Sequence, residues 1–400
     1  MSATVEITPK TEIESRVKKM QENLREQGIV AAIITQNVDT FYFTGSTQRG
    51  HMIIPAEGEA VYLVNKSLER AKTESPLSNI EYQQNLKTLP LALQERVGDI
   101  KGKKIGMELD VLPTALYLRY KDLFSGAEIV DVSLQIRELR MIKSPYEINI
   151  LRQVAEISRQ MLASVPDFLK AGRRELDFAA DLEHVFRILG HQGMCRLRQY
   201  NQDTFYGHVM SGASITVASL FDGPTSGPGL NPFYPQGPSL KIIEAGDMVL
   251  VDYVTTYKGY CVDNTRVFCL GEPPAEIAKA HKDALIIHEE IIKAAKPGTT
   301  CSELANLAYS MAAEMGYEEN FMGYGSDKAA FIGHGVGLEL DELPVLTARQ
   351  NYPMTEGMVF ALEPKILFKD KGIAGVENTV FFNGQNLEKL IQHPEEIICV

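Results

Sequence analysis

Apolar residues recur three and four positions apart between residues 11 and 28, which predicts an amphipathic helix that ends at Gly28. The residues on its apolar face are Ile13, Val17, Met20 and Leu24. Short apolar runs follow, with helical segments between some of them: IVAAIITQ, HMIIPAEGEAVYLV, KKIGMEL and AEIVDV. This alternation predicts an α/β domain over residues 1–138. No G-x-G-x-x-G follows its first strand, so a dinucleotide site is not supported.

A second domain is predicted over residues 139–400, after the polar, proline-containing bridge LQIRELRMIKSPYEINILRQ. It contains two similar segments, FLKAGRRELDFAADLEHVFRILGHQG and AAKPGTTCSELANLAYSMAAEMGYEE. Each has a helix end, a glycine turn, a further helix and a glycine stop, and Thr300 with Glu303 matches a capping box. Because strands follow each copy, we predict an α+β domain with two pseudo-symmetric halves and a site where they meet.

The first set of strands carries two aspartates in the segment VDYVTTYKGYCVDNTR. Its flanks are rich in β-branched and aromatic residues, which predicts two strands joined by a turn at TYKG. A turn centred between Tyr257 and Lys258 would place Asp252 directly opposite Asp263. Two carboxylates in that position repel each other, so we expect cations to bind between them.

The second set of strands, MVFALEPKI and AGVENTVFF, carries Glu363 and Glu377, which face each other if their loop is centred on Asp370. Between the two acid pairs lies FIGHGVGLELDELP, where glycines around His334 permit close backbone approach. Each residue taken singly is more often structural than functional. Together, four carboxylates and one imidazole form a ligand set for two divalent metal ions that share bridging carboxylates.

Charge and cysteine content restrict the partners and the location. The formal net charge is −12 and no run of Lys or Arg stands out, so neither nucleic acid nor an anionic membrane is expected as a partner. The five cysteines have no paired spacing, which is typical of reduced thiols. The N-terminal residues form no apolar signal core, and no membrane-length apolar span follows. We therefore expect a cytoplasmic protein.

Four motifs resemble those of metallopeptidase family M24, the methionine aminopeptidase, prolidase and creatinase group: VDYVTTYKGYCVDNTR, GHGVGLE, LEP and VENT. The N-terminal region up to FYFTGS and the bridge LRMIKSPYEINILR resemble the Xaa-Pro dipeptidase (prolidase) and creatinase branch. The resemblance covers nearly the whole chain. It implies a creatinase/prolidase-type α/β domain followed by an α+β domain with the pita-bread fold.

The resemblance also implies a chemistry. Asp252 would bind one ion, His334 and Glu363 the other, and Asp263 and Glu377 would bridge two ions of Mn²⁺, Co²⁺, Zn²⁺ or Fe²⁺. A water between the ions would be the nucleophile, and Glu363, with His334 beside it, would carry the catalytic proton transfer. Family members favour bonds that precede proline, and members of this branch are commonly homodimers.

The substrate shell departs from the family pattern. Family peptidases carry an accessory histidine in the region where this chain has SGASITVASLFDGP, a stretch that contains Asp222 and no histidine. They carry another histidine at the position of Asp341, and an accessory arginine at the position of Gly375. Such groups normally bind the peptide carbonyl and the reaction intermediate. Asp222 and Asp341 add negative charge, which suits a cationic or amine-bearing ligand, and His208 and Tyr324 are candidate replacement donors.

Three functions are compatible with these observations. The first is a dinuclear Xaa-Pro dipeptidase or aminopeptidase with an altered substrate shell, and the prolidase-like motif spacing favours it. The second is a non-peptidase enzyme on the same scaffold, a creatinase-like enzyme or a lyase acting on a small cationic molecule, and the missing histidines favour it. The third is a catalytically inactive binding protein, against which the complete metal-ligand set argues. A small peptide or small molecule is the expected partner in each case.

Overall fold

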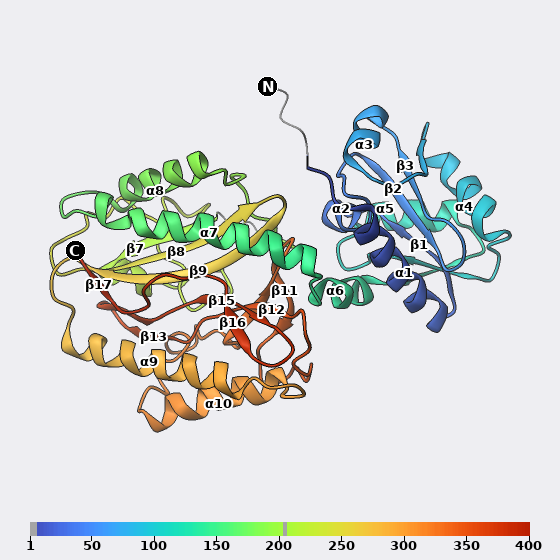
Figure 1. Cartoon of the computed structure of the whole chain (residues 1–400). Coiled ribbons are helices and arrows are strands. Elements are labelled where there is room, and N and C mark those ends of the chain that lie inside the picture. Colours follow the sequence, from blue (N-terminus) through green and yellow to red (C-terminus); the bar gives the residue numbers. More distant parts are fainter. Residues whose placement is uncertain (1–5, 203–205) are drawn as a thin grey trace. The chain divides into compact units, whose positions relative to one another are not determined.

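The computed structural model describes residues 6–202 and 206–400. The chain divides into two compact units, Met1–Arg140 and Met141–Val400 (Figure 1). Among the described residues, no helix combines the length and apolar character needed to cross a membrane.

The N-terminal unit contains a six-stranded mixed sheet in the order β4-β3-β2-β1-β5-β6. The strands are β1 (Ile29–Ile34), β2 (Gly50–Pro55), β3 (Val61–Val64), β4 (Ile80–Tyr82), β5 (Lys104–Met107) and β6 (Glu128–Asp131). The helices are α1 (Lys10–Glu26), α2 (Asn37–Thr44), α3 (Leu68–Glu74), α4 (Leu89–Val97), α5 (Thr114–Leu123) and α6 (Ser133–Met141). The predicted α/β class is confirmed, and the expected apolar face of α1 is buried.

The first half of the second unit begins with α7 (Pro145–Phe168) and α8 (Glu175–Leu189). A capping box formed by Ser144 and Glu147 starts α7, so most of the segment interpreted as a polar bridge is helical. The strands of this half are β7 (Gly207–Ser211), β8 (Met248–Tyr257) and β9 (Tyr260–Cys269). They form a sheet in the order β17-β9-β8-β7, completed by the C-terminal strand β17 (Ile398–Cys399).

The second half repeats this plan with α9 (Ala275–Ala294) and α10 (Cys301–Glu314), and the capping box at Thr300 and Glu303 is confirmed. Its main sheet has the order β11-β10-β12-β15-β16, and β13 and β14 form a separate hairpin. The strands are β10 (Gly333–Val336), β11 (Leu340–Val345), β12 (Val359–Leu362), β13 (Lys365–Phe368), β14 (Gly372–Gly375), β15 (Asn378–Phe382) and β16 (Leu387–Lys389). The break at Glu363 and Pro364 divides what the sequence pattern suggested as a single strand.

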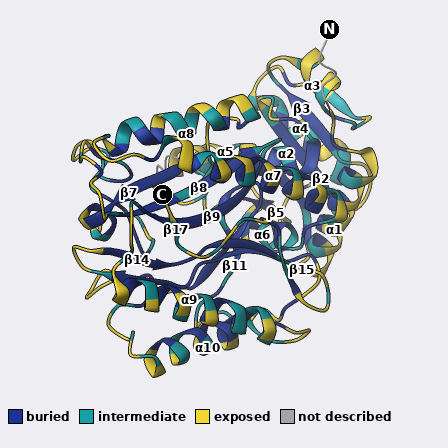
Figure 2. Ribbon diagram, turned by 60° about the vertical axis from the view of Figure 1, so that its left-hand side comes forward, coloured by how far each residue is buried: buried dark blue, intermediate teal, exposed yellow. Residues whose placement is uncertain are grey.

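The strands of the second unit lie between its helices and are mostly buried, while α8, α9 and α10 expose part of their surface (Figure 2). The two halves join between β9 and β15. Asp263 N–H donates to Thr379 Oγ1 at 2.8 Å, and that hydroxyl donates back to the Asp263 carbonyl at 2.8 Å. Thr265 and Glu377 form an antiparallel bridge at the same place. The predicted seam between two halves is therefore present, and two of the acids lie on it.

The first hairpin has a different register from the one predicted. Asp252 lies opposite Thr265, and Asp263 lies opposite Val254. The turn is centred on Lys258 and Gly259, which have φ values of 51° and 88° and so fit the type I′ turn that right-handed strand twist favours. Direct pairing of the two aspartates was wrong, and they are instead diagonal neighbours on one face of the sheet.

The second acid pair has the predicted register. Leu362 lies opposite Asn378 on one side of the pair, and Lys365 lies opposite Gly375 on the other. Glu363 and Glu377 occupy the matching positions between these two ladders. The loop expected around Asp370 therefore places these two carboxylates across from each other.

Candidate metal centre

The five predicted ligands come together in one pocket of the second unit. Asp252 is on β8, Asp263 is on β9 and His334 is on β10, whereas Glu363 and Glu377 lie at the interruptions next to β12 and β15. All are buried except Asp252, which is half-buried. Burying four carboxylates together is costly unless cations compensate them. A cation can compensate these carboxylates at two places, one beside His334 and one occupied by the ammonium of a lysine.

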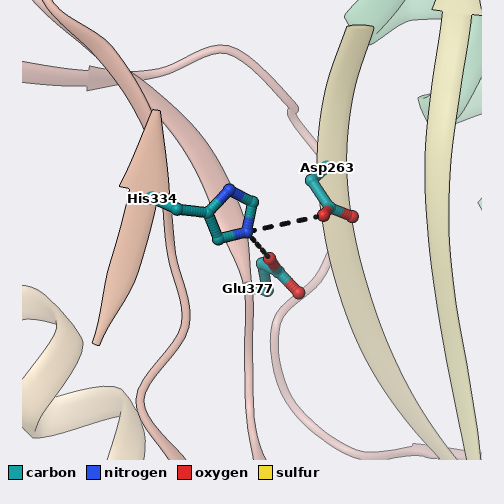
Figure 3. A group of neighbouring side chains, drawn as sticks. All are labelled: Asp263, His334 and Glu377. Carbon is teal, nitrogen blue, oxygen red and sulfur yellow. Dashed lines mark ion pairs between the residues drawn. The ribbon is translucent and has the colours of Figure 1, made fainter. Parts of the chain in front are cut away.

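On the first side, carboxylate oxygens surround the imidazole of His334. Its Nε2 lies 3.8 Å from Asp263 Oδ2 and 3.9 Å from both Glu363 Oε1 and Glu377 Oε1. Figure 3 shows His334 directed at Asp263 and Glu377, which together form a candidate metal-binding group. Two ligand atoms that share an ion at about 2.1 Å each lie no more than about 4.2 Å apart. The ligand atoms of His334, Asp263 and Glu377 all lie within 4.8 Å of one another, so these three residues are the ones placed to share one divalent cation, and Glu363 Oε1 lies beside them.

An orphaned atom supports this fit. Asp263 Oδ1 is buried and has no hydrogen-bond partner within the described part of the chain. Buried polar atoms almost always have a hydrogen-bond partner, so an unsatisfied carboxylate oxygen beside a histidine indicates a site for a bound cation. An ion held by His334, Asp263 and Glu377 would place a positive charge next to this carboxylate.

On the second side, the carboxylates surround a lysine that the motif analysis overlooked. Lys365 Nζ lies 2.8 Å from Glu363 Oε2, 2.8 Å from Glu377 Oε2 and 3.2 Å from Asp252 Oδ2. Glu363 and Lys365 are two positions apart, at the end of β12 and the start of β13. The sequence signal was therefore a lysine immediately after the LEP motif.

The electrostatics reflect an excess of negative charge. Burial, together with the neighbouring Glu377 and Asp252, raises the pKa of Asp263 well above its usual range. Burial also raises the pKa of Glu377 to about 7, although Lys365 opposes the shift. Burial by itself lowers the pKa of Lys365, but Asp252, Glu363 and Glu377 outweigh it and raise the pKa overall. The cluster thus holds its lysine charged and still favours a further cation.

Asp341 and Asp222, which the sequence suggested as substrate-binding residues, also line this pocket. Asp341 Oδ1 lies 3.3 Å from Nδ1 of His334, the ring nitrogen that faces away from the other ligands. A carboxylate in this position orients a metal-binding histidine and fixes its tautomer. Asp341 therefore contacts a candidate ligand directly, whereas Asp222 is an exposed residue at the pocket wall.

The two remaining candidates lie in different surroundings. His208 lines the same pocket and pairs with Asp252 across β7 and β8. Its Nε2 is buried without a hydrogen-bond partner among the described residues, and burial lowers its pKa. Tyr324 is 45% exposed and lines a neighbouring pocket instead. The structure thus brings His208 to the predicted metal ligands but does not bring Tyr324 there.

A second group of candidate ligands, His288, Glu289 and Glu395, lies outside this pocket. Lys389 Nζ is 2.5 Å from Glu289 Oε1 and 2.8 Å from Glu395 Oε2, so an ammonium already compensates both acids. We therefore assign no metal to this group.

Two α+β halves with carboxylates and one histidine at their junction define the class of pita-bread metallohydrolases. The chain belongs to metallopeptidase family M24, whose model matches residues 149–383. The creatinase/prolidase N-terminal domain matches residues 16–142.

Relatives match over nearly the full length. The chain is 27% identical over 387 residues to an Xaa-Pro dipeptidase of Pyrococcus horikoshii, covering 96% of this chain and 98% of that protein. The structure of an Xaa-Pro dipeptidase from Bacillus anthracis superimposes with a TM-score of 0.82 at 25% identity, covering 97% and 100% of the two chains. The X-Pro aminopeptidase of Thermotoga maritima gives 0.78 at 26% identity, covering 96% and 99%.

Proposed function

We propose that the protein is a metal-dependent peptidase that cleaves short Xaa-Pro peptides. One observation carries the proposal: His334, Asp263 and Glu377 bring their ligand atoms together at one buried place in a pocket, with Glu363 beside them. Full-length similarity to Xaa-Pro dipeptidases supports the substrate class. A bound divalent ion there supplies a Lewis acid and lowers the pKa of a bound water.

Glu363 is the residue we assign to proton transfer. Lys365 donates a hydrogen bond to its Oε2, whereas its Oε1 faces His334. Oε1 is therefore the oxygen positioned to take a proton from water and return it to the leaving amine. His334 would hold the ion, and Asp341 fixes the orientation of its ring.

The pocket walls support a small substrate with a positive end. Asp222 and Asp341 contribute negative charge, and Phe221, Phe331 and Leu340 contribute apolar surface. We assign Asp222 to the α-ammonium of the peptide, and Asp341, which contacts Nδ1 of His334, adds negative charge to the same pocket. The unpartnered Nε2 of His208 is the candidate donor to a substrate carbonyl. Mn²⁺, Co²⁺, Zn²⁺ or Fe²⁺ as the metal, a homodimer and a cytoplasmic location stay predictions from the sequence.

The test is peptide hydrolysis by protein loaded with Mn²⁺ or Co²⁺. The panel contains Xaa-Pro dipeptides, longer peptides that begin with Xaa-Pro, and matched Xaa-Ala peptides. We expect turnover of the proline peptides, and we expect Glu363→Gln to abolish it while Glu356→Gln, an exposed control, leaves it unchanged. Cleavage of Xaa-Ala peptides at equal rates would contradict the assigned specificity.

A second function is favoured by the paired acids Asp222 and Asp341. They suit a small cationic molecule that is cleaved at a bond other than a peptide bond. Metal-loaded protein that cleaves no peptide of the panel would support this alternative and reject the peptidase.

A further inference from the structure

The site has two cation positions, one beside His334 and one at Lys365, and the same carboxylates offer one oxygen to each position. Glu363 and Glu377 each direct Oε1 toward His334 and Oε2 toward Lys365. Asp252 contacts the lysine at 3.2 Å. This is the arrangement in which carboxylates bridge two cations, and here one of the cations belongs to the chain itself.

The ammonium of Lys365 is fully satisfied at this position. A lysine has three N–H donors, and Asp252, Glu363 and Glu377 provide one acceptor oxygen each. The side chain is only 2% exposed, so its charge has no route to water. A metal ion on this side would have to compete for the same three oxygens and leave a buried ammonium without partners.

The expected set of two ions does not fit these residues, because one of the two positions is taken. We infer that the centre binds a single divalent ion, on the His334 side, and that the Lys365 ammonium permanently replaces the second. The inference rests on the proposed metal-dependent function and specifies its centre. Asp252 is then a partner of the lysine and not a ligand of the ion.

The distribution of charge agrees with this assignment. The carboxylates of Asp252, Asp263, Glu363 and Glu377 face one ammonium and one divalent ion, and Asp341 and Asp222 add further negative charge to the pocket. Two divalent ions together with the lysine would instead place three cations within one buried cluster. Opposite charges at short range stabilise a buried site, whereas a third cation would be repelled by the other two.

The test measures bound metal and requires no substrate. Metal-free protein is equilibrated with excess Mn²⁺, and bound metal is counted by mass spectrometry after free ion is removed. We expect one ion per chain in the unaltered protein and two in Lys365→Ala. Lys143→Ala is the matched control, because Lys143 is also buried and pairs with a carboxylate, Glu342, at 3.1 Å; we expect one ion there.

Two ions in the unaltered protein, or none, would overturn the inference, as would one ion in folded Lys365→Ala. If that variant does not fold, the electron paramagnetic resonance spectrum of the unaltered protein decides, since isolated Mn²⁺ and exchange-coupled pairs differ. Failure of peptide hydrolysis with one ion bound would reject the proposed function and leave the inference standing. Proline-specific hydrolysis with two ions bound would reject the inference of a single ion and leave the proposed function standing.

Discussion

Asp341 Oδ1 lies 3.3 Å from Nδ1 of His334, on the side of the imidazole ring opposite the other candidate ligands. The residue has φ of 62°, in the left-handed region that aspartate adopts more readily than most residues. Its carboxylate therefore supports the histidine from behind. This contact gives Asp341 a role in positioning His334, in addition to any contact with substrate.

Replacing Asp341 should weaken metal binding. We expect Asp341→Ala to lower the affinity for Mn²⁺ by about 10- to 100-fold, because the orienting partner of His334 is lost. Asp341→Asn keeps an acceptor for the ring N–H and should fall between Ala and the unaltered protein. Calorimetric titration of metal-free protein gives the affinities.

Asp222→Ala is the control for that comparison, since Asp222 lines the pocket wall. It should raise the KM for Xaa-Pro peptides and leave metal affinity unchanged. Equal metal affinity in Asp341→Ala and Asp222→Ala would show that Asp341 does not position His334.

The two aspartates of the first hairpin should behave differently. Asp263→Asn should lower bound metal, since Asp263 Oδ2 faces His334 at 3.8 Å, and Glu377→Gln should do the same. Asp252→Asn should retain the ion, because the contact of Asp252 in the cluster is with Lys365. Elemental analysis after dialysis distinguishes them. Loss of the ion in Asp252→Asn would show that Asp252 is a ligand.

Much of this arrangement follows from the sequence. Residues of high β-propensity predicted the strands, and the helix signals and the two similar segments predicted two halves with a seam that brings the acids together. The register of Asp252 and Asp263 was missed because the turn was centred one residue too early. Lys258 and Gly259 both have positive φ, and the glycine is the signal that places a two-residue type I′ turn there.

Lys365 was missed for a different reason. The predicted site contained only residue types that bind metals, and lysine is not among them, although Lys365 follows Glu363 by only two positions. Which three acids its ammonium would contact depends on the packing of β8 against the second half, and local pattern does not specify such a contact. The contact between Asp341 and His334 likewise depends on a left-handed backbone conformation that the sequence does not impose.

The seam between the halves should be sensitive to Thr379. Its hydroxyl makes two hydrogen bonds of 2.8 Å with the backbone of Asp263, and the residue is fully buried. Thr379→Val preserves the shape and removes both bonds, which should destabilise the protein by about 1–3 kcal/mol. Thr347→Val, which loses one solvent-exposed hydrogen bond at a half-buried residue, should change the melting temperature much less. Equal melting temperatures for the two variants would contradict this role.

His288 should contribute to acid sensitivity. It is buried in α9, and burial, with Lys389 and Arg266 nearby, lowers its pKa well below the usual value. The folded state therefore binds a proton less readily than the unfolded state. The stability that depends on neutral His288 is present above about pH 6.5 and is lost as the pH falls toward the lower folded-state pKa.

His288→Gln should accordingly flatten the decline in melting temperature between about pH 7 and pH 5 relative to the unaltered protein. His184→Gln changes an exposed histidine of α8 and serves as the control. An unchanged slope in His288→Gln would exclude His288 as a source of the pH dependence.

The most direct measurement is hydrolysis of an Xaa-Pro dipeptide while metal-free protein is titrated with Mn²⁺ under tight-binding conditions. We expect the rate to rise in proportion to added metal and to level off at one ion per chain, with no cleavage of the matched Xaa-Ala dipeptide. Absence of proline-dependent turnover at every ratio of metal to protein would contradict a metal-dependent Xaa-Pro peptidase.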